Sequence, residues 1–72
     1  MNEKELGSIL KKMYTDAPRG EQVAMIHLFG IKYHNEIKLV GVKDVIRESG
    51  ISSTYATEVS KAVSLAKYVR VL

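Results

Sequence analysis

The chain has 72 residues, no cysteine and a formal net charge of +3, which is compatible with nucleic acid as a partner but does not demand it. Its hydrophobic content of 46% excludes a disordered chain, and its length is enough for one small core, so we expect a single domain over residues 1–72. Because it has no disulfide, no signal-peptide segment and no apolar run long enough to cross a bilayer, the sequence predicts a cytoplasmic protein without a membrane partner.

The first predicted helix spans Glu3 to about Thr15. Its apolar residues recur every three or four positions and so form one stripe, made of Leu6, Ile9, Leu10, Met13 and Tyr14. Asn2 and Glu5 have the spacing of a capping box at its start. Pro18, in the segment that breaks this helix, suits the first position of the next one.

The second predicted helix runs from about Arg19 to Glu36 and is apolar around most of its circumference, so we expect it in the middle of the domain. Gly30 inside it costs about 1 kcal/mol relative to alanine, which predicts that another helix approaches closely there. His27 and His34 lie about 10.5 Å apart along such a helix. That separation is too long for one metal ion, so we expect structural histidines packed among apolar neighbours.

Residues 37–42 are rich in β-branched side chains and predict an extended connector or a short strand. The tail also has β character, so residues 69–72 could pair with residues 38–40 as a minimal two-stranded ribbon. Two further helices are predicted, from Val42 to Ser49 and from Ser53 to about Tyr68. The predicted fold is therefore a compact, all-α, four-helix domain.

The last two predicted helices meet at Gly50, which predicts a tight turn with a positive φ at this glycine. Ser52 or Ser53 would begin the second of these helices, because a hydroxyl can accept a hydrogen bond from an unpaired backbone N–H of the first turn. Ile51 would fill the angle between the helices. Ala56 and Val59 would then face inward.

These residues resemble the helix-turn-helix DNA-binding domains of bacterial and phage regulators. Gly50, Ile51, Ala56 and Val59 match the pattern of that family, whereas Ile46 and Ser49 depart from it, since the family usually has a small residue and an apolar residue at those two positions. Across its whole length the chain also resembles small bacterial proteins that are described only as helix-turn-helix-like. The first resemblance implies binding of double-stranded DNA through the helix that begins near Ser53.

The outward face of that helix carries small hydroxyl side chains and Lys61, which suits a helix that enters the major groove. The binding could be sequence-specific or architectural, in transcriptional or mobile-element regulation, and a homodimer on paired half-sites is compatible with it. A plain solvated face is the alternative explanation of these side chains. The candidate DNA-binding residues are Ser52, Ser53, Thr54, Thr57, Lys61, Ser64, Lys43 and Arg47.

A protein-interaction module is the alternative function, and the acidic residues Asp44, Glu48 and Glu58 near the same helix favour it. Single-strand binding would need aromatic side chains stacked along a basic groove, and few tyrosines are available for that. The serines occupy turn and cap positions, and no phosphate-binding loop, dinucleotide motif or metal-ligand pattern occurs. We therefore expect no enzyme activity, no metal and no cofactor.

Overall fold

The computed structural model describes all 72 residues and contains five α-helices and a 3₁₀ turn, without a strand. The all-α prediction is confirmed. The elements are α1 (Glu3–Thr15), α2 (Gln22–Lys32), α3 (His34–Val40), α4 (Val42–Ser49), the 3₁₀ turn η1 (Ser53–Tyr55) and α5 (Ala56–Leu65). The bounds of α1 and α4 are those that the sequence predicts.

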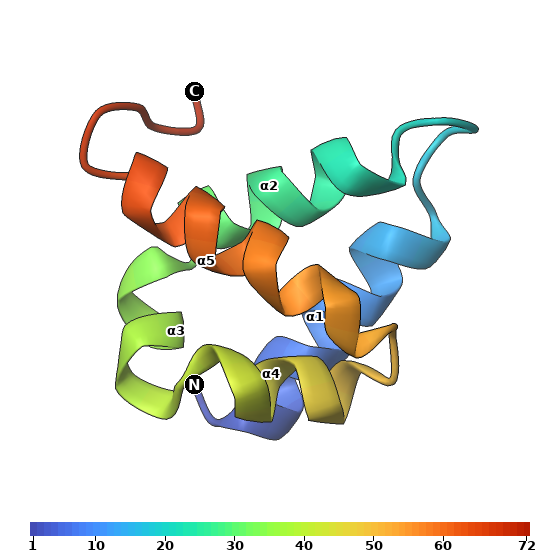
Figure 1. The fold of residues 1–72 in the computed structure, drawn as a ribbon, viewed down its shortest axis with the longest axis horizontal. Coiled ribbons are helices and arrows are strands. Elements are labelled where there is room, and N and C mark those ends of the chain that lie inside the picture. Colours follow the sequence, from blue (N-terminus) through green and yellow to red (C-terminus); the bar gives the residue numbers. More distant parts are fainter.

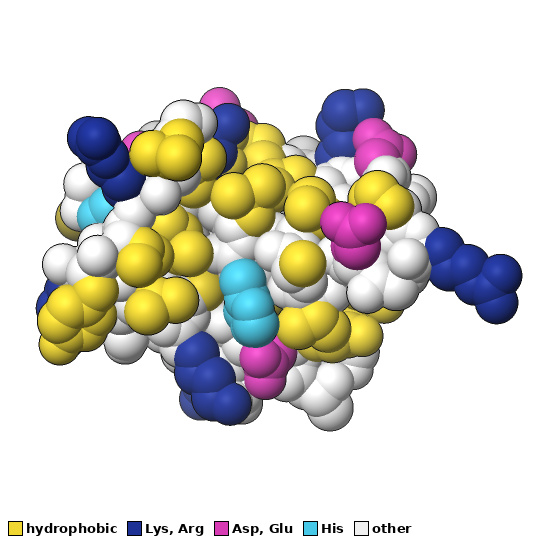
Figure 2. Space-filling view, turned by 90° about the horizontal axis from the view of Figure 1, so that it is seen from above, with side chains coloured by type: hydrophobic (Ala, Val, Ile, Leu, Met, Phe, Trp, Pro, Cys, Tyr) yellow, Lys and Arg dark blue, Asp and Glu magenta, His cyan; other side chains and the backbone are white.

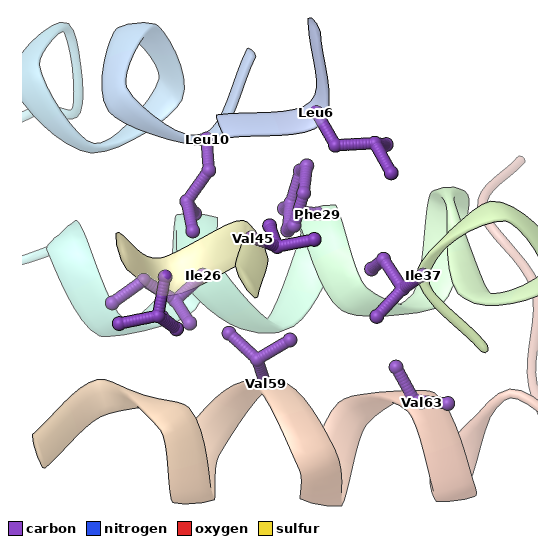
Figure 3. Packing of buried hydrophobic residues seen from close by; sticks show 9 residues of the cluster. Leu6, Leu10, Ile26, Phe29, Ile37, Val45, Val59 and Val63 are labelled. Atoms are coloured by element: carbon purple, nitrogen blue, oxygen red, sulfur yellow. The ribbon is translucent and has the colours of Figure 1, made fainter. Parts of the chain in front are cut away.

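The helices form two closely packed pairs. α1 packs most extensively on α4, and α2 on α5, while α3 joins the two pairs at one end of the molecule (Figure 1). Side chains from all five helices meet between the pairs, where Leu6 and Leu10 extend from α1 into the cluster that contains Phe29, and Val59 and Val63 point inward from α5 (Figure 3). The buried cluster consists of Leu6, Leu10, Ile26, Phe29, Ile37, Val45, Ile46, Val59 and Val63.

Two glycines let the paired helices approach closely. A Cβ added at Gly30 would lie 2.5 Å from the Cβ of Ala62 on α5, which confirms the close approach predicted there. A Cβ at Gly7 would lie 2.7 Å from the backbone carbon of Glu48 on α4. Both positions therefore favour glycine over any residue with a Cβ, and the sequence predicts only the first of the two close approaches.

The prediction of one helix from Arg19 to Glu36 is wrong at both ends. Pro18 does not begin a helix, because its carbonyl accepts a bond from the N–H of Glu21 in a turn. Gly20 follows with φ +83°, and α2 starts only at Gln22. At the other end the imidazole of His34 donates from Nδ1 to the carbonyl of Ile31, at 2.8 Å. Tyr33, between the two helices, departs from helical geometry with φ −111° and ψ 24°, so α2 stops at Lys32 and α3 begins at His34.

Residues 37–40 are helical, so the predicted connector or strand is wrong, and so is the ribbon, since residues 69–72 have no regular structure. The reason is tertiary: Ile37 is fully buried in the core, and burial overrides the weak β preference of this segment. The additional helix α3 makes the fold one of five α-helices instead of four.

The position predicted for the second helix is also wrong. Only Ile26, Phe29 and Gly30 of α2 are buried, while Val23 is 41% exposed. α2 lies at the surface and packs on α5 and α1, so part of its apolar circumference faces solvent.

Candidate nucleic-acid interface

The turn between α4 and η1 has the predicted conformation. Gly50 has φ 74° and ψ 2°, in the left-handed region, and its N–H donates to the carbonyl of Arg47 at 3.3 Å. Beyond it the hydroxyl of Ser52 accepts from the N–H of Thr54 at 3.3 Å, as a helix cap does. The chain then enters η1 and α5 as one continuous element, which ends at Leu65 and not near Tyr68 as predicted.

Ser49 and Ile46, which depart from the helix-turn-helix pattern, are both accommodated. Ser49 is 1% exposed, and its hydroxyl donates to the carbonyl of Ile46 at 2.6 Å and accepts from the N–H of Ile51 at 3.3 Å. The hydroxyl therefore has a partner both as donor and as acceptor, so its burial costs little free energy. Ile46 is 4% exposed and joins the core cluster.

The outer face of η1 and α5 is exposed, as the sequence predicts, because Val59, Ala62 and Val63 point the opposite way into the core. A shallow hollow of about 490 Å³ runs along this face. It is lined by Thr57, Ser60, Lys61, Ser64, Leu65, Lys67 and Tyr68. Three of the predicted site residues therefore lie together on one helix, and small hydroxyl side chains keep the helix narrow there.

Residues of α4 extend the site across the turn. A second hollow, of about 390 Å³, lies between α4 and the start of α5. It is lined by Lys43, Ile46, Arg47, Ser53 and Ala56, so the fold brings the predicted residues Lys43 and Arg47 to Ser53. Ser52, Ser53 and Thr54 are exposed at the start of η1.

The basic side chains of the site are interleaved with acidic ones. Arg47 pairs with Asp44 at 3.0 Å and with Glu48 at 3.6 Å, whereas Lys43 makes no ion pair. Lys61 lies 3.7 Å from a carboxylate oxygen of Glu58. The site therefore carries positive charge without forming a continuous positive strip. Exposed pairs of this kind are weak, so these cations can exchange their partners.

Glu58 has a second partner that the sequence does not predict. The imidazole of His27 on α2 donates from Nε2 to Oε1 of Glu58 at 2.8 Å, and the side chain of His27 is 41% exposed. The prediction that His27 packs only among apolar neighbours is therefore wrong, because this hydrogen bond also links α2 to α5. The hydrogen bond from His27, followed by the charge of Lys61, holds the pKa of Glu58 below its usual range. No local pattern could reveal a pair that is 31 positions apart.

Two other features of the structure bear on what the site can do. No group of three or more histidine, aspartate or glutamate side chains stands where it could hold a metal ion. No helix is long and apolar enough to cross a membrane. What the site offers is a row of hydroxyl donors and acceptors along one narrow helix, with lysine and arginine on both sides of a turn.

Comparison with known proteins identifies the family. A family model described as an HTH-like domain matches residues 2–71, and the chain therefore belongs to that helix-turn-helix-like family. No curated protein and no solved structure matches the chain.

Proposed function

We propose that this member of the HTH-like domain family binds double-stranded DNA with the outer face of η1 and α5, in transcriptional or mobile-element regulation. The observation that carries the proposal is the row of small exposed hydroxyl side chains on α5, which continues across the Gly50 turn to Lys43 and Arg47. A helix narrowed in this way can enter a major groove about 12 Å wide.

The site residues divide into two roles in this proposal. Lys43, Arg47 and Lys61 contact phosphates and position the domain, while Thr57 lies where its methyl and hydroxyl groups can contact a base edge. The exposed turn at Ser52–Thr54 presents hydroxyl groups, those of Ser52 and Thr54 lying 2.8 Å apart, which suit a phosphate of the flanking strand. Ser64 continues the same face toward the end of α5.

The experiment is a titration of labelled duplex DNA at several salt concentrations with two matched serine variants. Ser60→Glu places a carboxylate in the middle of the outer face of α5, and Ser8→Glu makes the same change on the exposed side of α1. We expect log Kd to rise linearly with log salt, Ser60→Glu to lose roughly tenfold or more in affinity, and Ser8→Glu to stay close to the wild type. Equal losses in the two variants would mean that α5 does not face the DNA.

A protein partner is the second candidate, and exposed apolar side chains at the end of α5 and in the tail favour it. They are Leu65, Tyr68, Val69, Val71 and Leu72. A homodimer formed through this surface would be compatible with DNA half-sites. If the wild-type domain has no salt-dependent affinity for duplex DNA even at low ionic strength, the protein partner becomes the leading candidate.

A further inference from the structure

Three side chains from two helices meet beside the outer face of α5. His27 donates to one carboxylate oxygen of Glu58 at 2.8 Å, and the ammonium group of Lys61 lies 3.7 Å from the other. The hollow around them is lined by His27, Glu58, Lys61, Ala62 and Leu65, so these three are its only titratable groups. Figure 2 shows a histidine beside an acidic side chain near the middle of one face, among apolar side chains.

We propose that the carboxylate of Glu58 competes with DNA phosphate for Lys61 and that protonation of His27 weakens this competition, so that the domain binds duplex DNA more tightly in mildly acidic solution. The inference rests on the proposed function, because Lys61 is one of its phosphate contacts. It assigns a regulatory role to His27, although His27 lies on α2 and not on the DNA-binding helix.

The direction of the effect follows from the hydrogen bond. The carboxylate of Glu58 can only accept, so Nε2 of His27 carries the hydrogen and Nδ1 is the nitrogen that takes up a further proton. Histidine is the side chain whose charge ordinarily changes between about pH 5 and 8. The pKa of Glu58 is lowered, chiefly by the same hydrogen bond, so its carboxylate stays charged over that range.

Protonation of His27 then places two full positive charges, on His27 and Lys61, beside the carboxylate of Glu58. The imidazolium is closer and is fixed by the packing of α2 on α5, whereas Lys61 is 69% exposed on a flexible stem and is the partner that can leave. The neighbours of His27 one turn away on α2 add no charge, since they are Val23, Ala24, Gly30 and Ile31. Beyond the end of α5 the next basic side chain is Lys67, which lies over the ring of Tyr68 and does not contact Glu58.

The test measures the affinity for labelled duplex DNA at about pH 5.5 and 7.5, at constant ionic strength. Wild-type protein should bind roughly threefold to tenfold more tightly at the lower pH, as expected for one additional unpaired cation at the interface. His27→Gln should lose this gain. Glu58→Gln should bind tightly at both pH values, because no carboxylate then competes for Lys61. Circular dichroism at both pH values checks that each variant is folded.

Two further variants separate release of Lys61 from a general effect of charge. His34→Gln removes the other histidine, which donates to the carbonyl of Ile31 and makes no contact with Glu58, and it should keep the wild-type gain. Lys61→Ala should reduce the gain, because the contact to be released is missing. An unchanged gain in His27→Gln or in Lys61→Ala, or equal wild-type affinity at both pH values, overturns the inference and leaves the proposed function standing. Absence of DNA binding at either pH overturns the proposed function itself.

Discussion

Glu58 links two helices through a single carboxylate, and its ionisation therefore contributes to the stability of the folded chain. The pKa of Glu58 is lower in the folded protein than its usual value because His27 donates a hydrogen bond to the charged form. A group with a lowered folded-state pKa stabilises the protein above its unfolded pKa, about 4.3 for glutamate. That stabilisation is lost as the pH falls through the folded-state pKa.

We therefore expect Glu58→Gln to have a lower unfolding free energy than the wild type at pH 7. The difference should disappear at about pH 2, where position 58 is neutral in both proteins. Urea denaturation at a series of pH values measures it. A difference that stays constant with pH would show that the side-chain amide disturbs packing and that charge is not the cause.

Lys61 and Thr57 should respond differently if the outer face of α5 binds DNA. Lys61→Ala removes a phosphate contact, most fully at about pH 5.5 where Glu58 competes least for this lysine, so at that pH it should weaken binding at every sequence and reduce the salt dependence by about one counterion. Thr57→Ala should change the sequence preference, at a cost of roughly 1 kcal/mol or more at one base pair. Titration of duplexes that differ at single positions measures both. Uniform weakening by Thr57→Ala would place its side chain on the phosphate backbone.

The turn between α4 and η1 depends on the backbone of Gly50 and not on space around it. An added Cβ at Gly50 would meet no atom within 4 Å, but φ is 74°. We expect Gly50→Val to cost roughly 1–3 kcal/mol of unfolding free energy, because a β-branched residue is strained in the left-handed region. Gly50→Asn should cost less, since asparagine tolerates this conformation. An unchanged urea midpoint for the valine variant would contradict the turn argument.

The α2–α5 pair depends on space at Gly30. Alanine there would gain about 1 kcal/mol of helix propensity. However, its Cβ would lie 2.5 Å from the Cβ of Ala62 and 3.1 Å from the carbonyl oxygen of Val59, and overpacking typically costs about 1–3 kcal/mol. We expect Gly30→Ala to be destabilising overall. The same substitution in an Ala62→Gly background should cost less. Urea denaturation of the wild type, the two single variants and the double variant measures the coupling between the two positions. Purely additive changes in unfolding free energy would mean that the Cβ of Ala62 does not limit the side chain at position 30.

At the scale of the whole molecule, one cluster of nine buried side chains holds all five helices together. Val59 lies within it, fully buried as the helical periodicity predicts, and Ile26 belongs to the same cluster. A domain of this size has a total stability of roughly 4–11 kcal/mol. The loss of the packing of one buried side chain can therefore be enough to unfold the domain.

Val59→Asp should unfold the domain, because an unpaired carboxylate in this core has no compensating partner. Thr57→Asp, two residues earlier on the exposed face, carries the same charge and should stay folded. Circular dichroism distinguishes the two. A folded Val59→Asp protein would mean that α5 is rotated from the orientation described.

The sequence by itself determined the features that depend on neighbours along the chain. The capping box of Asn2 and Glu5, the bounds of α1 and α4, the left-handed Gly50 and the inward face of α5 all follow from spacing or from the conformational freedom of glycine. The same local rules put the predicted hydroxyl side chains of α5 on one exposed face. Their role in DNA binding stays a prediction.

Only the tertiary structure decided the features that depend on distant partners. Burial of Ile37 made a helix of a segment with β preference, and the break at Tyr33 divided the long predicted helix in two. The close approach at Gly7 and the pairing of His27 with Glu58 join residues far apart in the sequence. Periodicity records which side of a helix is buried but not what covers it, so these contacts arise only when the helices pack.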